Sequence, residues 1–291
     1  MGTSMATAPA SVLQQRPSAY WLLVAPSFLL VLVLYALPVL NILWLSFTDP
    51  QPGLGNYRKI IESDTVARLI WTTLRICLLT TLFSVALGYV VAYGMLHARA
   101  NIRQRMMSIL LVSFWISVLV RSFAWLMLLG NNGLINGALM WAGLISEPIP
   151  LVRNEVGVLI GMTEYMVPYA VLPLLANMQG IDQRVLSASR SLGASGAQTF
   201  LRIFLPLTRP GIVAASLLVF IGSLGFYVTP AILGGGRVQM IAEYISVQLL
   251  VTVRWGTAAM LATVMLISVL ALMYLLSRFV KLSTLFGGGA S

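Results

Sequence analysis

Charged residues are scarce in this sequence. They make up 9% of the 291 residues, whereas hydrophobic residues make up 59%. A soluble domain carries about 25% charged residues, so the composition indicates an integral membrane protein. The sequence also lacks the alternating segments of about ten residues that are typical of a membrane β-barrel. We therefore expect spanning helices, because lipid offers no hydrogen-bond partner to an unpaired backbone group.

Reactive side chains are equally few. The single cysteine, Cys77, allows no disulfide within the chain, and we expect it to be a small buried residue. With His97 as the only histidine, we expect no metal site and no catalytic residues. Neither Lys59 nor Lys281 follows the glycine pattern of a phosphate-binding loop. The sequence therefore predicts no nucleotide cofactor in this chain.

Six apolar stretches are long enough to span a membrane, which takes about 20 residues. We predict an all-α membrane domain over residues 20–280, with tails at 1–19 and 281–291 and a long loop at 179–210. The first stretch is much longer than the apolar region of a cleaved signal peptide, so we expect a retained anchor helix. The predicted spans are Tyr20–Phe47, Leu69–His97, Met107–Leu129, Val156–Met178, Gly211–Leu233 and Trp255–Val280.

The net charge of +10 is unevenly distributed. With the N-terminus in the cytoplasm, the predicted outer segments hold equal numbers of acidic and basic residues. The predicted cytoplasmic segments hold one acid, Asp182, and these basic residues: Arg16, Arg99, Arg103, Arg105, Arg184, Arg190, Arg202, Arg209, Arg278 and Lys281. This is the positive-inside pattern. It predicts that both termini are cytoplasmic, and it explains the positive charge without nucleic acid as a partner.

The connection at residues 179–210 is longer than two adjacent helices need. It retains apolar residues at helical spacing, such as Leu201, Phe204 and Leu205. We predict two short helices separated near Gly193 and Gly196, the first at about residues 182–192. Pro206 is expected to end the second.

The same loop resembles the EAA loop of ABC importer permeases. The relevant residues are Leu186-Ser187-Ala188-Ser189-Arg190-Ser191-Leu192-Gly193-Ala194-Ser195, then Phe200-Leu201-Arg202-Ile203-Phe204-Leu205-Pro206-Leu207. The spacing from Ala188 through Gly193 to Pro206 fits the family pattern. Ser187 and Ser189 depart from it, since they replace the family's Glu and Ala. The resemblance implies a coupling helix seated on an ATPase, a role that we carry over to Ser187, Ala188, Gly193, Ala194 and Pro206.

Three further stretches resemble the spermidine/putrescine branch of these permeases. They are Leu119-Val120-Arg121-Ser122-Phe123-Ala124-Trp125 with Asn132-Gly133-Leu134-Ile135-Asn136, and Gly225-Phe226-Tyr227-Val228-Thr229-Pro230-Ala231-Ile232-Leu233-Gly234-Gly235. Together with Asn56-Tyr57, the resemblance covers about residues 20–285. Opines, ferric iron, phosphonates and amino-acid-like solutes remain alternatives to a polyamine.

The resemblance also implies a set of partners. They are a second, homologous permease subunit, a dimer of ATPase subunits that binds ATP and magnesium, and a periplasmic or lipid-anchored solute-binding protein. This chain would form half of the path for a small polar solute in the bacterial inner membrane.

Three charged residues lie inside the predicted spans at similar depth: Arg75, Arg121 and Glu164. Charges inside a membrane usually pair or line a water-filled path. Two readings of Glu164 stay open, a structural pair with one of the arginines and a contact to a cationic solute.

Aromatic residues near this depth could line a path for an ammonium group through cation–π contacts, or they could pack helices together. The predicted pathway residues are Glu164, Trp125, Tyr165, Phe226 and Tyr227. An ion-driven secondary transporter is the main rival from another class, but the sequence shows no convincing internal repeat and a single acid within its spans. A membrane enzyme is disfavoured because no catalytic cluster is present.

Overall fold

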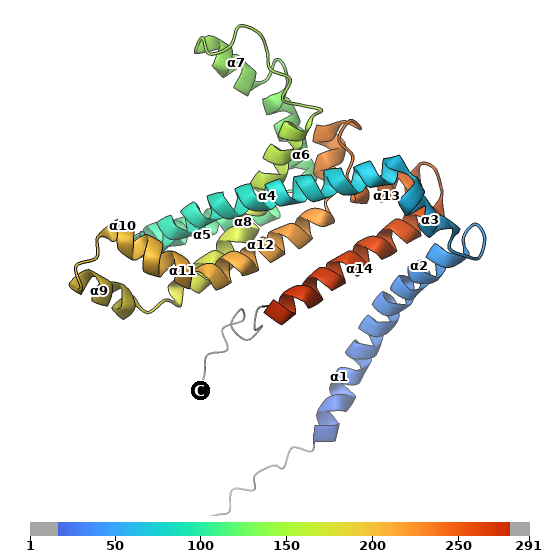
Figure 1. Ribbon diagram of the computed structural model, residues 1–291, viewed down its shortest axis with the longest axis horizontal. Coiled ribbons are helices and arrows are strands. Elements are labelled where there is room, and N and C mark those ends of the chain that lie inside the picture. The colour runs from blue at the N-terminus through green and yellow to red at the C-terminus, as the bar shows by residue number, and fades with distance from the viewer. Residues whose placement is uncertain (1–16, 280–291) are drawn as a thin grey trace, which may run out of the picture.

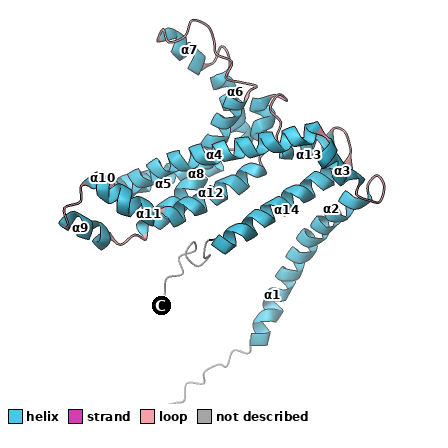
Figure 2. Ribbon diagram, viewed as in Figure 1, coloured by secondary structure: helices cyan, strands magenta, loops and turns pink. Residues whose placement is uncertain are grey.

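The computed structural model describes residues 17–279, and within this range all regular secondary structure is helical (Figures 1 and 2). Most of the two expected tails and the last residue of the sixth expected span lie outside the described residues. The elements are α1 (Pro17–Val31), π-helix η1 (Leu32–Ala36), α2 (Leu37–Thr48), α3 (Gly55–Glu62), α4 (Asp64–His97), α5 (Ala100–Trp115), α6 (Val118–Leu129), α7 (Leu134–Trp141), α8 (Glu155–Gln179), α9 (Gln183–Ser191), α10 (Gly196–Thr199), π-helix η2 (Phe200–Phe204), α11 (Leu205–Leu207), α12 (Arg209–Leu224), π-helix η3 (Pro230–Gly234), α13 (Ile241–Leu250) and α14 (Trp255–Phe279).

Five of the described helices are long and apolar enough to span a membrane, and the number rises to six if one bent pair of helices is counted as a single span. This pair is Gly196–Leu207 and Arg209–Leu224, whose two parts meet at 57°. The predicted all-α membrane fold is therefore confirmed. In Figure 1, α9 lies at one end of the bundle and α3 and α13 at the other, while α6 and α7 form an arm that projects from its side.

Two of the expected spans are interrupted. The stretch Gly211–Leu233 is not one helix, because α12 ends at Leu224 and Pro230 opens the separate segment η3. Gly225 follows α12 directly, and glycine and proline are the two weakest helix formers. The prediction of an unbroken fifth span was wrong in its last third for this reason.

The expected third span, Met107–Leu129, is also two helices, with residues 116–117 between α5 and α6. No glycine or proline marks this break. In a continuous helix the Ser113 carbonyl would accept a hydrogen bond from the N–H of Ser117. Here the Arg121 side chain donates to that carbonyl instead, so a side chain from the next helix satisfies the end of α5.

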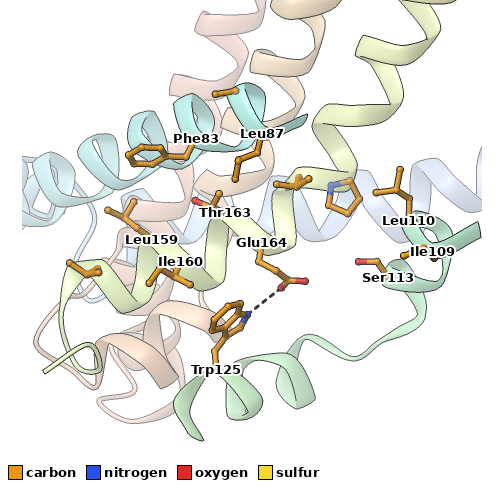
Figure 3. A pocket seen from close by; sticks show the side chains of 14 residues that line it. Phe83, Leu87, Ile109, Leu110, Ser113, Trp125, Leu159, Ile160, Thr163 and Glu164 are labelled. Carbon is orange, nitrogen blue, oxygen red and sulfur yellow. Dashed lines mark hydrogen bonds between the residues drawn. The ribbon is translucent and has the colours of Figure 1, made fainter. Parts of the chain in front are cut away.

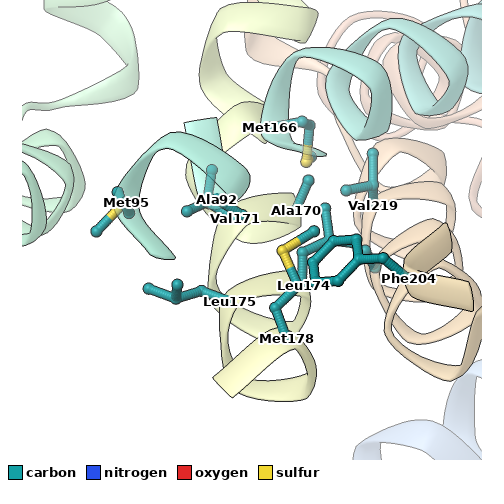
Figure 4. Packing of buried hydrophobic residues seen from close by; sticks show 11 residues of the cluster. Ala92, Met95, Met166, Ala170, Val171, Leu174, Leu175, Met178, Phe204 and Val219 are labelled. Carbon is teal, nitrogen blue, oxygen red and sulfur yellow. The ribbon is translucent and has the colours of Figure 1, made fainter. Parts of the chain in front are cut away.

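The centre of the bundle is the packing of α8 against α4 and α12. Its core contains Met166, Ala170, Leu174 and Val219 (Figure 4), all buried. Gly88 allows the close approach of α4 to α8, because a Cβ atom there would lie 2.8 Å from the Cβ of Ala170. Small residues at such contacts are the usual means of packing membrane helices.

Polar contacts hold the helices together at the end of the bundle that lies opposite α9. The Asp49 carboxylate accepts a 2.6 Å hydrogen bond from the backbone N–H of Gly256, at the start of α14. Asn56 donates to the Asp49 carbonyl at 2.6 Å, and the hydroxyls of Ser46 and Tyr57 lie 2.7 Å apart. These contacts join the loop after α2 to α3 and α14.

Glu243 is a buried acid on α13, outside the six spans. Its residue is 6% exposed, and its Oε2 atom has no hydrogen-bond partner among the described residues. Burial raises the pKa of Glu243 to about 7, although a hydrogen bond with the backbone of Met240 lowers it. The folded state therefore holds this proton more tightly than the unfolded state, whose carboxyl has the ordinary pKa of 4.5.

We expect Glu243→Gln to stabilise the protein at alkaline pH. Stability that depends on a raised carboxyl pKa is complete below pH 4.5 and is lost as the pH rises through about 7. The variant should gain about 1–3 kcal/mol at pH 8 and little at pH 4.5. Thermal unfolding at both pH values checks this, with the exposed Glu62→Gln as control. A gain of equal size at both pH values would contradict it.

Candidate functional site

A cavity of about 930 Å³ opens between α4, α5, α6 and α8 (Figure 3). Its lining is mainly apolar, and Glu164 is the only charged residue in it. The residues around it are Phe83, Ala86, Leu87, Ile109, Leu110, Ser113, Trp125, Val156, Leu159, Ile160, Thr163, Glu164, Val167 and Pro168. Sites for small molecules typically have volumes of about 300–1,000 Å³ and few polar groups, so this cavity has the size and character of a ligand site.

Helical spacing explains why α8 contributes half of this lining. Residues 156, 159, 160, 163, 164, 167 and 168 repeat at three- and four-residue intervals and share one face. The other faces of α8 pack against α4 and α12. Glu164 thus projects into the cavity from a helix that the core holds fixed.

Glu164 has two long polar contacts. One carboxylate oxygen lies 3.5 Å from Nη1 of Arg121, and the other lies 3.5 Å from the indole nitrogen of Trp125. The Glu164 side chain is 38% exposed, whereas that of Arg121 is 11% exposed. The structure brings together one of the two arginine–glutamate pairs that the sequence allowed, and the carboxylate still faces the cavity.

Arg75 is not part of this cluster. Its guanidinium pairs with Glu155, at the start of α8, and not with Glu164. The prediction that Arg75 forms a cluster with Arg121 and Glu164 was therefore wrong. Glu155 precedes the expected span Val156–Met178, but it occupies the first turn of α8, within reach of α4.

The other predicted pathway residues separate into two environments. The rings of Tyr165 and Phe226 are tilted against each other with centroids 4.6 Å apart, and the Arg121 guanidinium lies over the Tyr165 ring, 5.0 Å from its centroid. Tyr227 is 48% exposed and lies outside the cavity lining. Of the five residues, Glu164 and Trp125 line the cavity, and Tyr165 and Phe226 form the aromatic packing beside it.

Sequence reasoning missed the remaining lining residues. Ser113 was the one with a usable signal, since a serine within an apolar span often faces a polar group or a partner helix. Phe83, Leu87 and Leu159 carry no such signal, because the same residues would equally suit a lipid-facing surface.

The loop at 179–210 contains the expected pair of helices. The first, α9, ends in a Schellman motif, in which the N–H groups of Gly193 and Ala194 bond the carbonyls of Arg190 and Ser189. Gly193 has φ +85°, a conformation that favours glycine. Ser195 then starts α10 with a capping box completed by Gln198. The turn at Gly193 agrees with the expected corner between the helices.

The second part of this loop is fixed to the core. The aromatic ring of Tyr93, on α4, makes edge-to-face contacts with Phe200 and Phe204 of η2. The hydroxyls of Tyr89 and Thr208 lie 3.1 Å apart. Pro206 lies in α11, one residue before that helix ends. The segment α10–η2–α11 therefore connects α9 to α4 and α12.

The outer face of α9 is open. Val185 is 44% exposed and Leu192 is 89% exposed, with Ala188 and Ser187 also exposed between them. Ser189 points the other way: it is buried, and its hydroxyl lies 3.0 Å from that of Thr199 on α10. The serine that departs from the family's alanine thus joins the two short helices.

The sequence matches a family model described as "Binding-protein-dependent transport system inner membrane component" over residues 84–282, more than half of the chain. It is 30% identical to the spermidine/putrescine transport system permease protein PotB of Haemophilus influenzae over 236 residues, covering 79% of this chain and 82% of that protein. It is 32% identical to PotB of Salmonella typhimurium strain SL1344 over 231 residues, covering 79% and 80%.

The fold also matches a solved structure. A chain from the crystal structure of a bacterial ABC transporter involved in the import of the acidic polysaccharide alginate superposes with a TM-score of 0.71 at 20% identity, covering 90% of this chain and 96% of that one. The likeness supports the helical arrangement alone. The matched segment begins within α4 and includes both the cavity-lining face of α8 and the 179–210 loop. The chain belongs to the inner membrane components of binding-protein-dependent transport systems, the permease subunits of ABC importers.

Proposed function

We propose that this permease imports a polyamine, such as putrescine or spermidine. The observation that carries the proposal is the identity of 30–32% to spermidine/putrescine permeases over most of both chains. The cavity chemistry agrees, because an alkyl chain that bears ammonium groups matches apolar walls with one carboxylate. Opines, amino-acid-like solutes, ferric iron and phosphonates are the alternatives within the same importer class.

The 179–210 loop is proposed to couple the permease to its ATPase. An exposed apolar face on α9 that includes Val185, Ala188 and Leu192 suits a groove on a partner protein. Because α10, η2 and α11 are fixed to α4 and continue into α12, a displacement of α9 would reach both spans. Rigid-body motions of this kind are a common route to alternating access.

The proposed assembly has four kinds of subunit. This chain forms half of the path, a homologous permease forms the other half, two ATPase subunits bind ATP and magnesium, and a binding protein delivers the solute. We place α9 and both termini in the cytoplasm, on the basis of the positive-inside pattern. Residues 20–280 form the spanning domain and 179–210 its coupling loop.

The solute assignment is tested by identifying what the partner binding protein holds. The binding protein that copurifies with the complex should release putrescine or spermidine on denaturation, as detected by mass spectrometry. Release of an opine, a ferric complex or a phosphonate would contradict the polyamine assignment and leave the importer class intact.

A further inference from the structure

The carboxylate of Glu164 has unused capacity to accept hydrogen bonds. An ionised carboxylate offers about four acceptor positions, and the two contacts to Arg121 and Trp125 are both at 3.5 Å, at the outer limit of a hydrogen bond. Its exposed fraction faces the cavity. A cation that enters can therefore approach Glu164 without displacing a short, well-formed hydrogen bond.

Arg121 does not depend on Glu164 for its position. Its Nη2 atom donates to the carbonyl of Ser113 and lies 3.2 Å from the Ser113 hydroxyl. Its guanidinium also lies over the ring of Tyr165. Arg121 would stay in place if the carboxylate turned toward another cation, so it can act as the resident partner of Glu164 while the cavity is empty.

The walls around Glu164 suit a polymethylene chain. Phe83, Leu87, Leu159 and Ile160 are apolar and lie on the neighbouring helices α4 and α8 (Figure 3). A primary ammonium donates three hydrogen bonds and carries a compact charge. A ligand with an ammonium group at the end of an alkyl chain would satisfy both the carboxylate and the walls.

The cavity has a neighbouring hollow on α5. Ile109 borders both this cavity and a second hollow on the same helix, whose other lining residues are Asn101, Gln104, Arg105 and Ser108. These residues repeat at three- and four-residue intervals and make one polar face of α5. A polar face on a helix that carries no buried residue of its own is suited to a solvated route.

We infer that this cavity is a transmembrane binding site for one alkylammonium group, with Glu164 as the counter-ion of that group. In the empty site, Arg121 is the cation that pairs with Glu164. The inference rests on the proposed polyamine function and adds to it the residue that recognises the charge. We expect this site to bind its ligand weakly, because a transported solute must leave the site as well as enter it.

The test measures binding to the complete transporter without its binding protein. Labelled putrescine and butylamine are the charged probes, and 1-butanol is the neutral competitor of similar length. Glu164→Gln should weaken binding of both amines about 10-fold or more, since it removes a charge-assisted hydrogen bond, and should leave binding of the alcohol unchanged. Glu155→Gln is the matched control: it removes an acid of similar exposure that pairs with an arginine, lies on the same helix and is not among the residues that line the cavity.

A second variant keeps the inference testable if Glu164→Gln fails to assemble. Trp125→Phe retains the aromatic ring and removes the indole N–H that competes for the carboxylate, so amine binding should tighten by about threefold. Unchanged amine binding in an assembled Glu164→Gln complex, or loss of alcohol and amine binding alike, would overturn the site. Uptake measurements separate the proposed binding site from the proposed function. If the wild-type complex imports putrescine and Glu164→Gln has no effect on import, only the binding site is rejected. If the wild-type complex imports no polyamine, the proposed function is rejected.

Discussion

Replacing Leu192 with aspartate is expected to release the ATPase from the complex. Leu192 is 89% exposed at the end of α9, so the change costs the isolated chain little. In the proposed coupled state this side chain is buried against the ATPase, and an unpaired carboxylate there costs on the order of 3 kcal/mol or more. The association should weaken by about 100-fold or more, as measured by copurification and by the affinity of the purified subunits.

The matched control is Leu144→Asp. Leu144 is 71% exposed in the loop after α7, on the arm that lies far from α9 (Figure 1), so the same change in charge should leave the ATPase bound. If Leu192→Asp retained both the ATPase and ATP-driven uptake, α9 would not be the coupling helix. Equal loss in both variants would mean that added charge, and not its location, disrupts the assembly.

Arg121→Gln is expected to destabilise the permease far more than Glu164→Gln. Arg121 is 11% exposed and joins three elements, through Ser113 on α5, its own helix α6, and Tyr165 and Glu164 on α8. Arg121→Gln removes the charge-assisted hydrogen bond to the Ser113 carbonyl, and hydrogen bonds of this kind contribute about 1.5–3 kcal/mol each. Glu164 is 38% exposed and its contacts are long, so its removal should cost about 1 kcal/mol or less.

The double variant separates these contributions. If the contacts of Arg121 to Ser113 and Tyr165 carry the stability, Arg121→Gln with Glu164→Gln should unfold at nearly the same temperature as Arg121→Gln alone. Arg75→Gln is the control, because its pair with Glu155 is half-exposed and should matter little. Equal losses in the two single variants, largely recovered in the double variant, would instead assign the stability to the ion pair itself.

The sequence was sufficient to predict the helical membrane fold and the approximate positions of the spans. Long apolar runs follow directly from the thickness of the bilayer, and the corner at Gly193 follows from the freedom of glycine to adopt positive φ. The capping box at Ser195 and Gln198 was not predicted, although its spacing is a local signal in the sequence.

The break between α5 and α6 could not be predicted in the same way. It depends on a hydrogen bond from Arg121 to the backbone of Ser113, a contact between two helices that no propensity within either segment records. The partner of Arg75 was missed for a related reason. Its depth in the membrane suggested Glu164 as the partner, but the packing of α4 against α8 brings Glu155 within reach of Arg75. The cavity likewise depends on which apolar faces meet.

The most direct test of the whole account is ATP-driven uptake by the reconstituted transporter. This chain, its partner permease, the ATPase subunits and the solute-loaded binding protein are placed in proteoliposomes so that ATP meets the ATPase and labelled putrescine is on the opposite side. The account predicts accumulation of putrescine that requires ATP hydrolysis, persists when ionophores collapse the ion gradients, and stops in Leu192→Asp. Uptake by this chain alone that follows an ion gradient and ignores ATP would contradict it.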